Sequence, residues 1–180
     1  AHQAGVGGAA YVYTRSGSVW TLEQSIDNPT PVASDYFGGS ISLYNNTFVV
    51  GANGDDSTGD AGGAAYVYTR SGTTWTLEQE ITSPGGVPAG DNFGISVSMY
   101  GESFLVGAYG DSTLAGSTGA AYVYTRSGTT WTLEATIDNP IPSASDIFGY
   151  CVSMSGNIAV VGSPYDDTGA SNTGSAYIFS

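Results

Sequence analysis

Basic side chains are scarce in this 180-residue sequence. Lysine is absent, and Arg15, Arg70 and Arg126 stand against sixteen Asp and Glu residues, which gives a formal net charge of −13. Because phosphates and anionic membranes are bound mainly by clustered lysine and arginine, we expect no nucleic-acid partner. No apolar run is long enough to cross a bilayer, so membrane insertion is not expected either. Cations, basic partners and neutral sugars remain compatible with this charge.

Cysteine and histidine each occur once, which excludes several kinds of chemistry. Cys151 cannot form a disulfide within the chain, and it takes the repeat position of Ser40 and Ser96, so we predict a small buried residue. With His2 as the only histidine and no lysine, neither a nucleophile–His–acid triad nor a Schiff base is expected. Paired carboxylates of the glycosidase kind recur in each repeat, whereas one active site would break that symmetry. The sequence therefore predicts a protein that is not an enzyme.

What the sequence does have is a tandem repeat. The segment GAAYVYTRSG occurs at 8–17, 63–72 and 119–128, and Trp-Thr-Leu follows it each time. A Phe-Gly pair and a Val-Gly pair recur with the same spacing, so every landmark returns after 55 or 56 residues. A period of this length indicates one multi-stranded unit per repeat, each of which needs a neighbour to cover its apolar face.

Each period contains four runs with strand character, separated by turns rich in Gly, Asp, Ser and Pro. In one full repeat these runs are 94–99, 103–108, 120–126 and 131–137. Several are apolar on both faces, which favours a sheet packed against each side. We therefore predict an all-β fold of β-propeller-type blades with four antiparallel strands each. The chain would be a single repeat domain over 1–180, with a partial blade at 8–35, blades at 36–90 and 91–145, and a partial blade at 146–180.

Three sequence segments carry a resemblance to a known family. They read Asp35-Tyr-Phe-Gly, Phe48-Val-Val-Gly-Ala and Gly63-Ala-Ala-Tyr-Val-Tyr, and they recur across the chain. This pattern resembles the FG-GAP repeat of the integrin-α-type β-propeller, in the variety found in bacterial surface proteins. The resemblance implies an extracellular, non-enzymatic binding or adhesion scaffold. The calcium loop that integrin-type repeats place between their first two strands is missing here, so calcium binding at those turns is not implied.

Up-and-down strand connectivity would gather the acidic residues at one end of the blades. We consider two interpretations of these aspartates. In the first they are oxygen ligands of the kind that calcium prefers, and in the second they form turns in which their carboxylates accept backbone N–H bonds. No cofactor is required, and Ca²⁺ is the metal such ligands would take. The candidate metal ligands are Asp35, Asp55, Asp56, Asp91, Asp111, Asp146, Asp166 and Asp167.

Aromatic and basic residues are predicted at other positions of each blade. Trp20, Trp75 and Trp131 begin alternating runs, which favours packing between blades over stacking on sugar rings. The arginines lie in turns at the end opposite the aspartates. We expect them to pair as surface contacts with the glutamates that follow each tryptophan, namely Glu23, Glu78 and Glu134.

The first and last blades are incomplete in the predicted strand order, which raises the question of assembly. Unpaired strand edges are seldom tolerated without a partner, so we expect chains to complete one another through Tyr11, Tyr13, Tyr177, Ile178 and Phe179. One functional hypothesis is a self-assembling extracellular structural protein, such as a surface-layer or filament subunit. The alternative is an adhesion or lectin-like module that binds a glycan or protein, with calcium dependence as an option.

Overall fold

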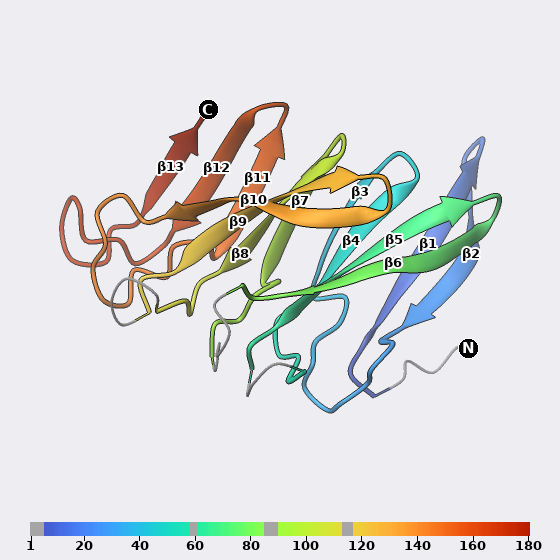
Figure 1. Cartoon of the computed structure of the whole chain (residues 1–180), viewed down its shortest axis with the longest axis horizontal. Coiled ribbons are helices and arrows are strands. Elements are labelled where there is room, and N and C mark those ends of the chain that lie inside the picture. The colour runs from blue at the N-terminus through green and yellow to red at the C-terminus, as the bar shows by residue number, and fades with distance from the viewer. Residues whose placement is uncertain (1–5, 58–60, 85–89, 113–116) are drawn as a thin grey trace.

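The computed structural model describes residues 6–57, 61–84, 90–112 and 117–180, so His2 lies outside the described residues. These residues form thirteen β-strands in four antiparallel sheets and no helix (Figure 1). No helix of the described residues could span a membrane. The sheets contain β1 (Ala9–Ser16) and β2 (Val19–Asp27); β3 (Ser40–Tyr44), β4 (Thr47–Ala52), β5 (Ala64–Ser71) and β6 (Thr74–Thr82); β7 (Ser96–Tyr100), β8 (Ser103–Ala108), β9 (Ala120–Ser127) and β10 (Thr130–Asp138); and β11 (Cys151–Ser155), β12 (Ile158–Ser163) and β13 (Ser175–Phe179).

Each four-stranded sheet is an up-and-down meander that follows the chain order. The third strand is apolar on both faces, and in β5 Tyr66 and Val67 are both fully buried. A tight turn with Gly72 at φ 63° leads from the third strand, β5, into the fourth, β6. The pairing register shifts between Val67 and Tyr68 of β5, so Glu78 of β6 is the extra residue of a β-bulge. The predicted all-β fold with blades of four antiparallel strands is therefore confirmed.

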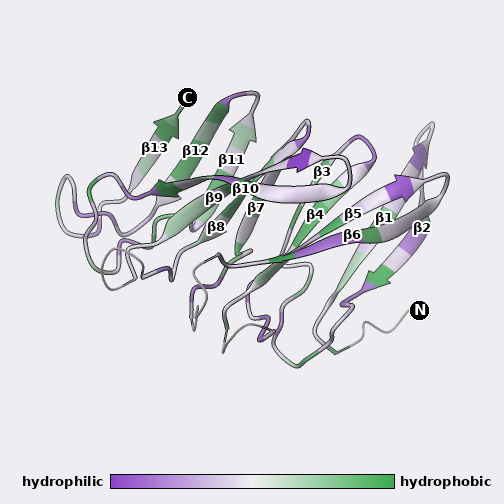
Figure 2. Ribbon diagram, in the orientation of Figure 1, coloured by the Kyte–Doolittle hydropathy of each residue, from purple (hydrophilic) through white to green (hydrophobic). Residues whose placement is uncertain are grey.

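Successive sheets stack face to face, and their packed faces form the core. The first cluster joins Val49 and Val67 of the second sheet to Phe104, Tyr124 and Trp131 of the third. Equivalent clusters lie between the first and second sheets and between the third and fourth. Figure 2 shows hydrophobic colour along the central strands β4, β8 and β12 and hydrophilic colour at hairpin ends. This arrangement is a partial propeller.

The Phe-Gly landmark links neighbouring sheets. Phe93 makes a parallel bridge to Gly63, and its backbone N–H donates to Gly62. Gly94 then adopts φ 89°, so β7 begins at Ser96, two residues later than the sequence predicts. The Phe-Gly pair therefore joins one blade to the next.

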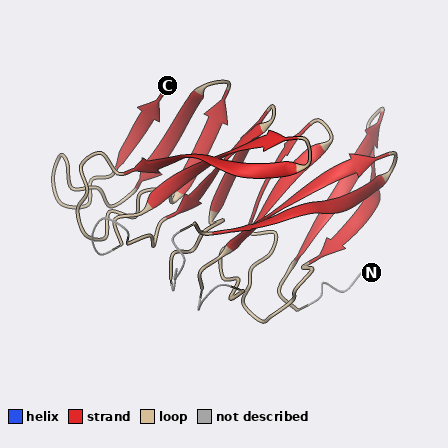
Figure 3. Ribbon diagram, viewed as in Figure 1, coloured by secondary structure: helices blue, strands red, loops and turns tan. Residues whose placement is uncertain are grey.

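The loops divide between two ends of the stack. Longer loops, which connect second to third strands and fourth to first strands, lie at one end, and tight hairpin turns lie at the other (Figure 3). The predicted aspartates lie in the long loops and the arginines lie at the hairpin end. The two groups of charges are therefore separated by the length of the strands.

Two sequence-based expectations about burial are wrong in the outer sheets. Cys151 is exposed, whereas Ser96 at the same repeat position is half-buried, and its hydroxyl oxygen accepts a hydrogen bond from the Val152 backbone N–H of the next sheet. Trp20 is 62% exposed, whereas Trp75 and Trp131 are buried between sheets as predicted. The reason is the same in both cases, because no sheet of the described chain covers those faces.

Candidate functional site

Neighbouring sheets are held together by a four-residue contact, which we call the clasp. In the first clasp Glu23 and Gln24 of β2 meet Arg70 and Trp75 of the second sheet. Glu23 accepts hydrogen bonds from Arg70 Nη2 at 2.5 Å and from Trp75 Nε1 at 3.0 Å. The Gln24 amide accepts from the Trp75 backbone N–H at 2.8 Å and donates to its carbonyl at 2.9 Å. The Arg70 hydrogen bond is the main reason that the pKa of Glu23 lies below its usual value.

The second clasp repeats the first between β6 and the third sheet. Glu78 pairs with Arg126 and accepts from Trp131 Nε1 at 2.9 Å, and Gln79 binds both backbone groups of Trp131. The guanidinium of Arg126 also lies 5.8 Å from the centre of the Trp131 ring. The Glu78 hydrogen bond raises the pKa of Arg126. The glutamates therefore bind the arginine of the following repeat, and the expected pairing within one repeat is wrong.

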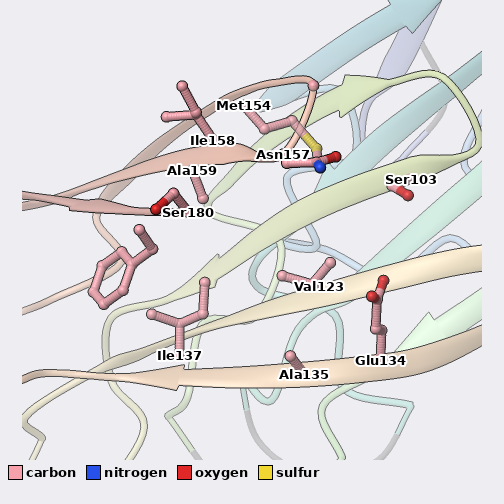
Figure 4. A pocket seen from close by; sticks show the side chains of 12 residues that line it. Ser103, Val123, Glu134, Ala135, Ile137, Met154, Asn157, Ile158, Ala159 and Ser180 are labelled. Carbon is pink, nitrogen blue, oxygen red and sulfur yellow. The ribbon is translucent and has the colours of Figure 1, made fainter.

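The third position of this contact is not filled. Glu134 of β10 corresponds to Glu23 and Glu78, but it is exposed and has no ion pair among the described residues. Ala135 stands where the other clasps have glutamine. A cavity of about 450 Å³ lies beside them, with Ile137 and Ala135 of β10 on one side and Met154 and Ala159 of the last sheet on the other (Figure 4). We call this cavity the Glu134 socket.

The outward face of the first sheet carries the other half of the clasp. Arg15 lies 5.9 Å from the ring centre of Trp20, as in the two filled clasps. Tyr13 and Trp20 are 52% and 62% exposed, and Tyr11 is 41% exposed. The equivalent residues of the second sheet are at most 5% exposed, because the first sheet covers them; they are Tyr66, Tyr68 and Trp75.

The predicted assembly residues at the other end divide between two faces. Ile178 points outward and is 73% exposed. Tyr177 and Phe179 are half-buried and lie 5.7 and 6.3 Å from the ring of Phe148, on the face packed against the third sheet. Tyr11 and Tyr13 of the first sheet, by contrast, lie together with Trp20 on one exposed face.

At the loop end, three of the candidate metal ligands each accept a hydrogen bond from a tyrosine hydroxyl. Asp55 accepts hydrogen bonds from the Tyr66 hydroxyl at 2.6 Å and from the Ser57 backbone N–H at 2.9 Å. The same Asp–Tyr pair recurs as Asp111 with Tyr122 and Asp166 with Tyr177. Burial opposes ionisation of Asp166, but hydrogen bonds from Thr168 and Tyr177 outweigh it and lower its pKa. Burial and the Asp55 partner raise the pKa of Tyr66.

The aspartate before each Phe-Gly is buried and only partly satisfied. Asp35 Oδ2 accepts from Asn28 Nδ2 at 2.6 Å and from the Val32 backbone N–H at 2.7 Å, while Oδ1 has no partner. Asp146 repeats this arrangement with Asn139 and Ser143, also with Oδ1 unpartnered. Burial is the main cause of the raised pKa of Asp35, and the nearby Asp55 carboxylate adds to it. Asp91, which accepts from the Ser83 hydroxyl at 2.9 Å, also has a pKa raised by burial.

The arrangement of these carboxylates limits what they can coordinate. Asp35, Asp55 and Asp56 line one cavity of about 170 Å³ together with Thr30 and Ser57. Asp56 and Asp167 are exposed and accept backbone N–H bonds within their own loops. In the described part of the chain, no three Asp, Glu, His or Cys side chains are grouped so that they could hold a metal ion. Most of the carboxylate oxygens therefore bind turns and tyrosines.

The sequence analysis did not identify the glutamines of the clasp or the tyrosine partners of the aspartates. Both sets of residues recur with a fixed spacing in the sequence, which could have revealed them. Gln24 and Gln79 follow the clasp glutamate directly, and Ala135 breaks that pattern. Tyr66, Tyr122 and Tyr177 each lie eleven residues after the aspartate that they bind.

The comparison with protein families agrees with the sheet geometry. A model described as the FG-GAP repeat matches residues 20–68, 75–124 and 131–179. Each match starts at or next to the clasp tryptophan of one sheet and ends in the third strand of the next. A search of curated proteins finds no match. Such repeats generally form structural or binding modules and are typical of extracellular or surface proteins. The chain belongs to the FG-GAP repeat family, and its sheets are integrin-like β-propeller blades.

Proposed function

We propose that this chain is a non-enzymatic, extracellular structural subunit that assembles with copies of itself. One observation carries the proposal. Tyr66, Tyr68 and Trp75 are 0%, 4% and 5% exposed where a neighbouring blade covers them, whereas Tyr13 and Trp20 are 52% and 62% exposed in the first sheet. Large exposed aromatic surfaces of this kind mark interaction sites. The net charge of −13 argues against nucleic acid as the partner.

The direct test is the mass of the purified chain over a wide concentration range. Light scattering coupled to gel filtration should detect species of at least twice the 18.3 kDa mass of one chain, and their fraction should rise with concentration. Electron microscopy of concentrated material should then distinguish closed particles from filaments. A chain that stays monomeric at all concentrations would contradict self-assembly and leave the binding module as the better account.

A second function, an adhesion or lectin-like module, is favoured by a different observation. Asp35 is buried with its Oδ1 unpartnered, and it lines a cavity together with Asp55 and Asp56. Carboxylate oxygens supported by backbone carbonyls and hydroxyls suit Ca²⁺, which would neutralise these charges and order the loops around a glycan or protein ligand. Isothermal titration with CaCl₂ tests this function. Binding that is lost in Asp35→Asn supports it, and the absence of heat together with an unchanged melting temperature contradicts it.

A further inference from the structure

The strands that the structure describes in the two outer sheets are complementary parts of a blade. In residues 6–57 the first sheet contains strands that correspond to the third and fourth of a blade, and in residues 117–180 the last sheet contains the first three. Ile41 and Leu43 of β3 are 50% and 60% exposed, although Val97 and Met99 at the same positions are 8% and 6% exposed. These surfaces are the ones that the first two strands of a preceding blade would cover.

We propose that the β1–β2 hairpin of a second copy replaces β13 beside β12, so that two chains share one complete blade. In this blade β11 and β12 of one chain supply the first two strands, and β1 and β2 of the other supply the third and fourth. The inference rests on the proposed self-assembly and names its partner and its contacts. The partner is a second copy of this chain.

β1 can take the place of β13 because the two strands are near copies. The chain reads Ala-Ala-Tyr-Val-Tyr in β1 and Ser-Ala-Tyr-Ile-Phe in β13. In the register of β4 with β5, Tyr13 would take the place of Phe179 opposite Ala159, and Tyr11 would take the place of Tyr177 beside Phe148. The backbone hydrogen bonds of β12 are therefore retained while one strand is exchanged for the other.

The Glu134 socket then receives the side chains that the other two clasps contain. Arg15 and Trp20 arrive on the hairpin with the geometry of Arg126 and Trp131. Trp20 fills a cavity whose lining includes Ala159, which stands where the third sheet has Phe104 in contact with Trp131. Glu134 gains the cation that its equivalents bind.

The same junction covers the remaining exposed surfaces. At the junction of the second and third sheets, Ser42 Oγ accepts from the Met99 backbone N–H and Ser40 Oγ donates to Gly94 O. By the same register, Ser153 of one chain would meet Leu43 of the other, and Cys151 would be covered. Gly162 also fits, because its equivalent Gly107 lies so close to the next sheet that an added Cβ would approach Gly149 O to 1.8 Å.

The junction can form twice between the same two chains. The described strands of each chain make two complete sheets, and each junction adds one shared sheet, so two copies of this part of the chain, related by a two-fold axis, would close a ring of six blades. Propellers typically have four to eight blades, which makes this ring size ordinary. Hairpin β1–β2 keeps its packing on its own second sheet throughout, so β13 is the strand that has to detach, from its pairing with β12.

The experiment measures the dimer dissociation constant by analytical ultracentrifugation and the reaction of Cys151 with a thiol reagent in the same samples. We expect dimers, with the thiol at least about tenfold less reactive in the dimer than in the monomer. Trp20→Ala should weaken the dimer by about 30-fold or more, since a buried tryptophan is a typical hot spot. Ala135→Gln should tighten it by about tenfold, because it restores the two hydrogen bonds of the glutamine. Leu77→Ala, at an exposed position of β6 in the second sheet and away from the shared blade, is the control and should change nothing.

Deletion of residues 175–180 separates strand exchange from docking on an intact last sheet. Exchange predicts a tighter dimer, because the competing β13 is gone, whereas docking on β13 predicts a weaker one. If the deletion variant fails to fold, Gly162→Ala still tests the junction itself, since its added Cβ should block packing of the next sheet and weaken the dimer while the monomer stays folded. A dimer that is unaffected by Trp20→Ala and leaves Cys151 reactive would overturn the shared blade but not self-assembly. A chain that is monomeric throughout would overturn both.

Discussion

The junction between the second and third sheets and the junction between the third and fourth sheets use the same motif with different results. At the first of these, Glu78, Gln79 and Trp131 interlock, and the tryptophan is 3% exposed. At the second, Glu134 faces a cavity of about 450 Å³. The clasp therefore requires residues from two neighbouring blades. Within one blade the motif does not bury its own glutamate and tryptophan.

The largest effect should come from removing the aromatic residue of a filled clasp. Trp131→Ala should lower the free energy of unfolding by about 3–5 kcal/mol, because it opens a cavity against Phe104 and removes a partner of the buried Glu78. Trp20→Ala in dilute, monomeric protein should change it by less than about 0.5 kcal/mol, since that side chain is exposed. Urea unfolding followed by circular dichroism measures both. Equal losses in the two variants would show that Trp20 is already buried in the monomer.

A glycine pair should give the next largest difference. Gly107→Ala places a Cβ 1.8 Å from Gly149 O of the next sheet, so the sheets must separate, at a cost of about 3 kcal/mol. Gly162→Ala meets the movable Cys151 Sγ at 2.4 Å and no backbone atom closer than 3.6 Å. We expect a loss below about 1 kcal/mol for that variant in the monomer. Thermal unfolding of the two variants side by side checks the prediction, and a comparable fall in melting temperature would contradict it.

The same comparison explains how much the sequence could predict. Strand runs, hairpin turns and the two charged ends follow from local periodicity and turn residues, so they could be predicted. Burial of Trp75 but not of Trp20 depends on whether a neighbouring blade is present, and both tryptophans follow the same GAAYVYTRSG segment and precede the same Thr-Leu-Glu-Gln segment. The pairing of Arg70 with Glu23 depends on a contact 47 residues apart between two sheets. Such cross-repeat contacts require the stacking geometry, which the repeat pattern does not contain.

The smallest predicted effect compares the acidic loop end with the clasp end through their pH dependence. Asp35 is buried with Oδ1 unpartnered, and burial raises its pKa above the ordinary value of an aspartate. A carboxyl group with a raised folded-state pKa stabilises the fold most in acid, and this contribution is lost as the pH rises through that pKa. Asp35→Asn keeps the acceptor for Asn28 and Val32 and removes the charge, so at pH 7 it should stabilise the protein by about 1 kcal/mol.

The matched variant at the clasp should behave in the opposite way. The pKa of Glu23 is lowered by Arg70, so its contribution is present above its unfolded-state pKa and is lost as the pH falls through the folded-state value. Glu23→Gln should therefore be less stable than the parent protein at pH 7, and the difference should vanish in acid. Asp35→Asn should also converge with the parent in acid, but from the more stable side. Melting temperatures of the three proteins between pH 3 and pH 7 in the presence of a chelator measure this. If Asp35→Asn is destabilising at pH 7 under those conditions, the Asp35 charge supports the loops directly, and the burial argument for its raised pKa is wrong.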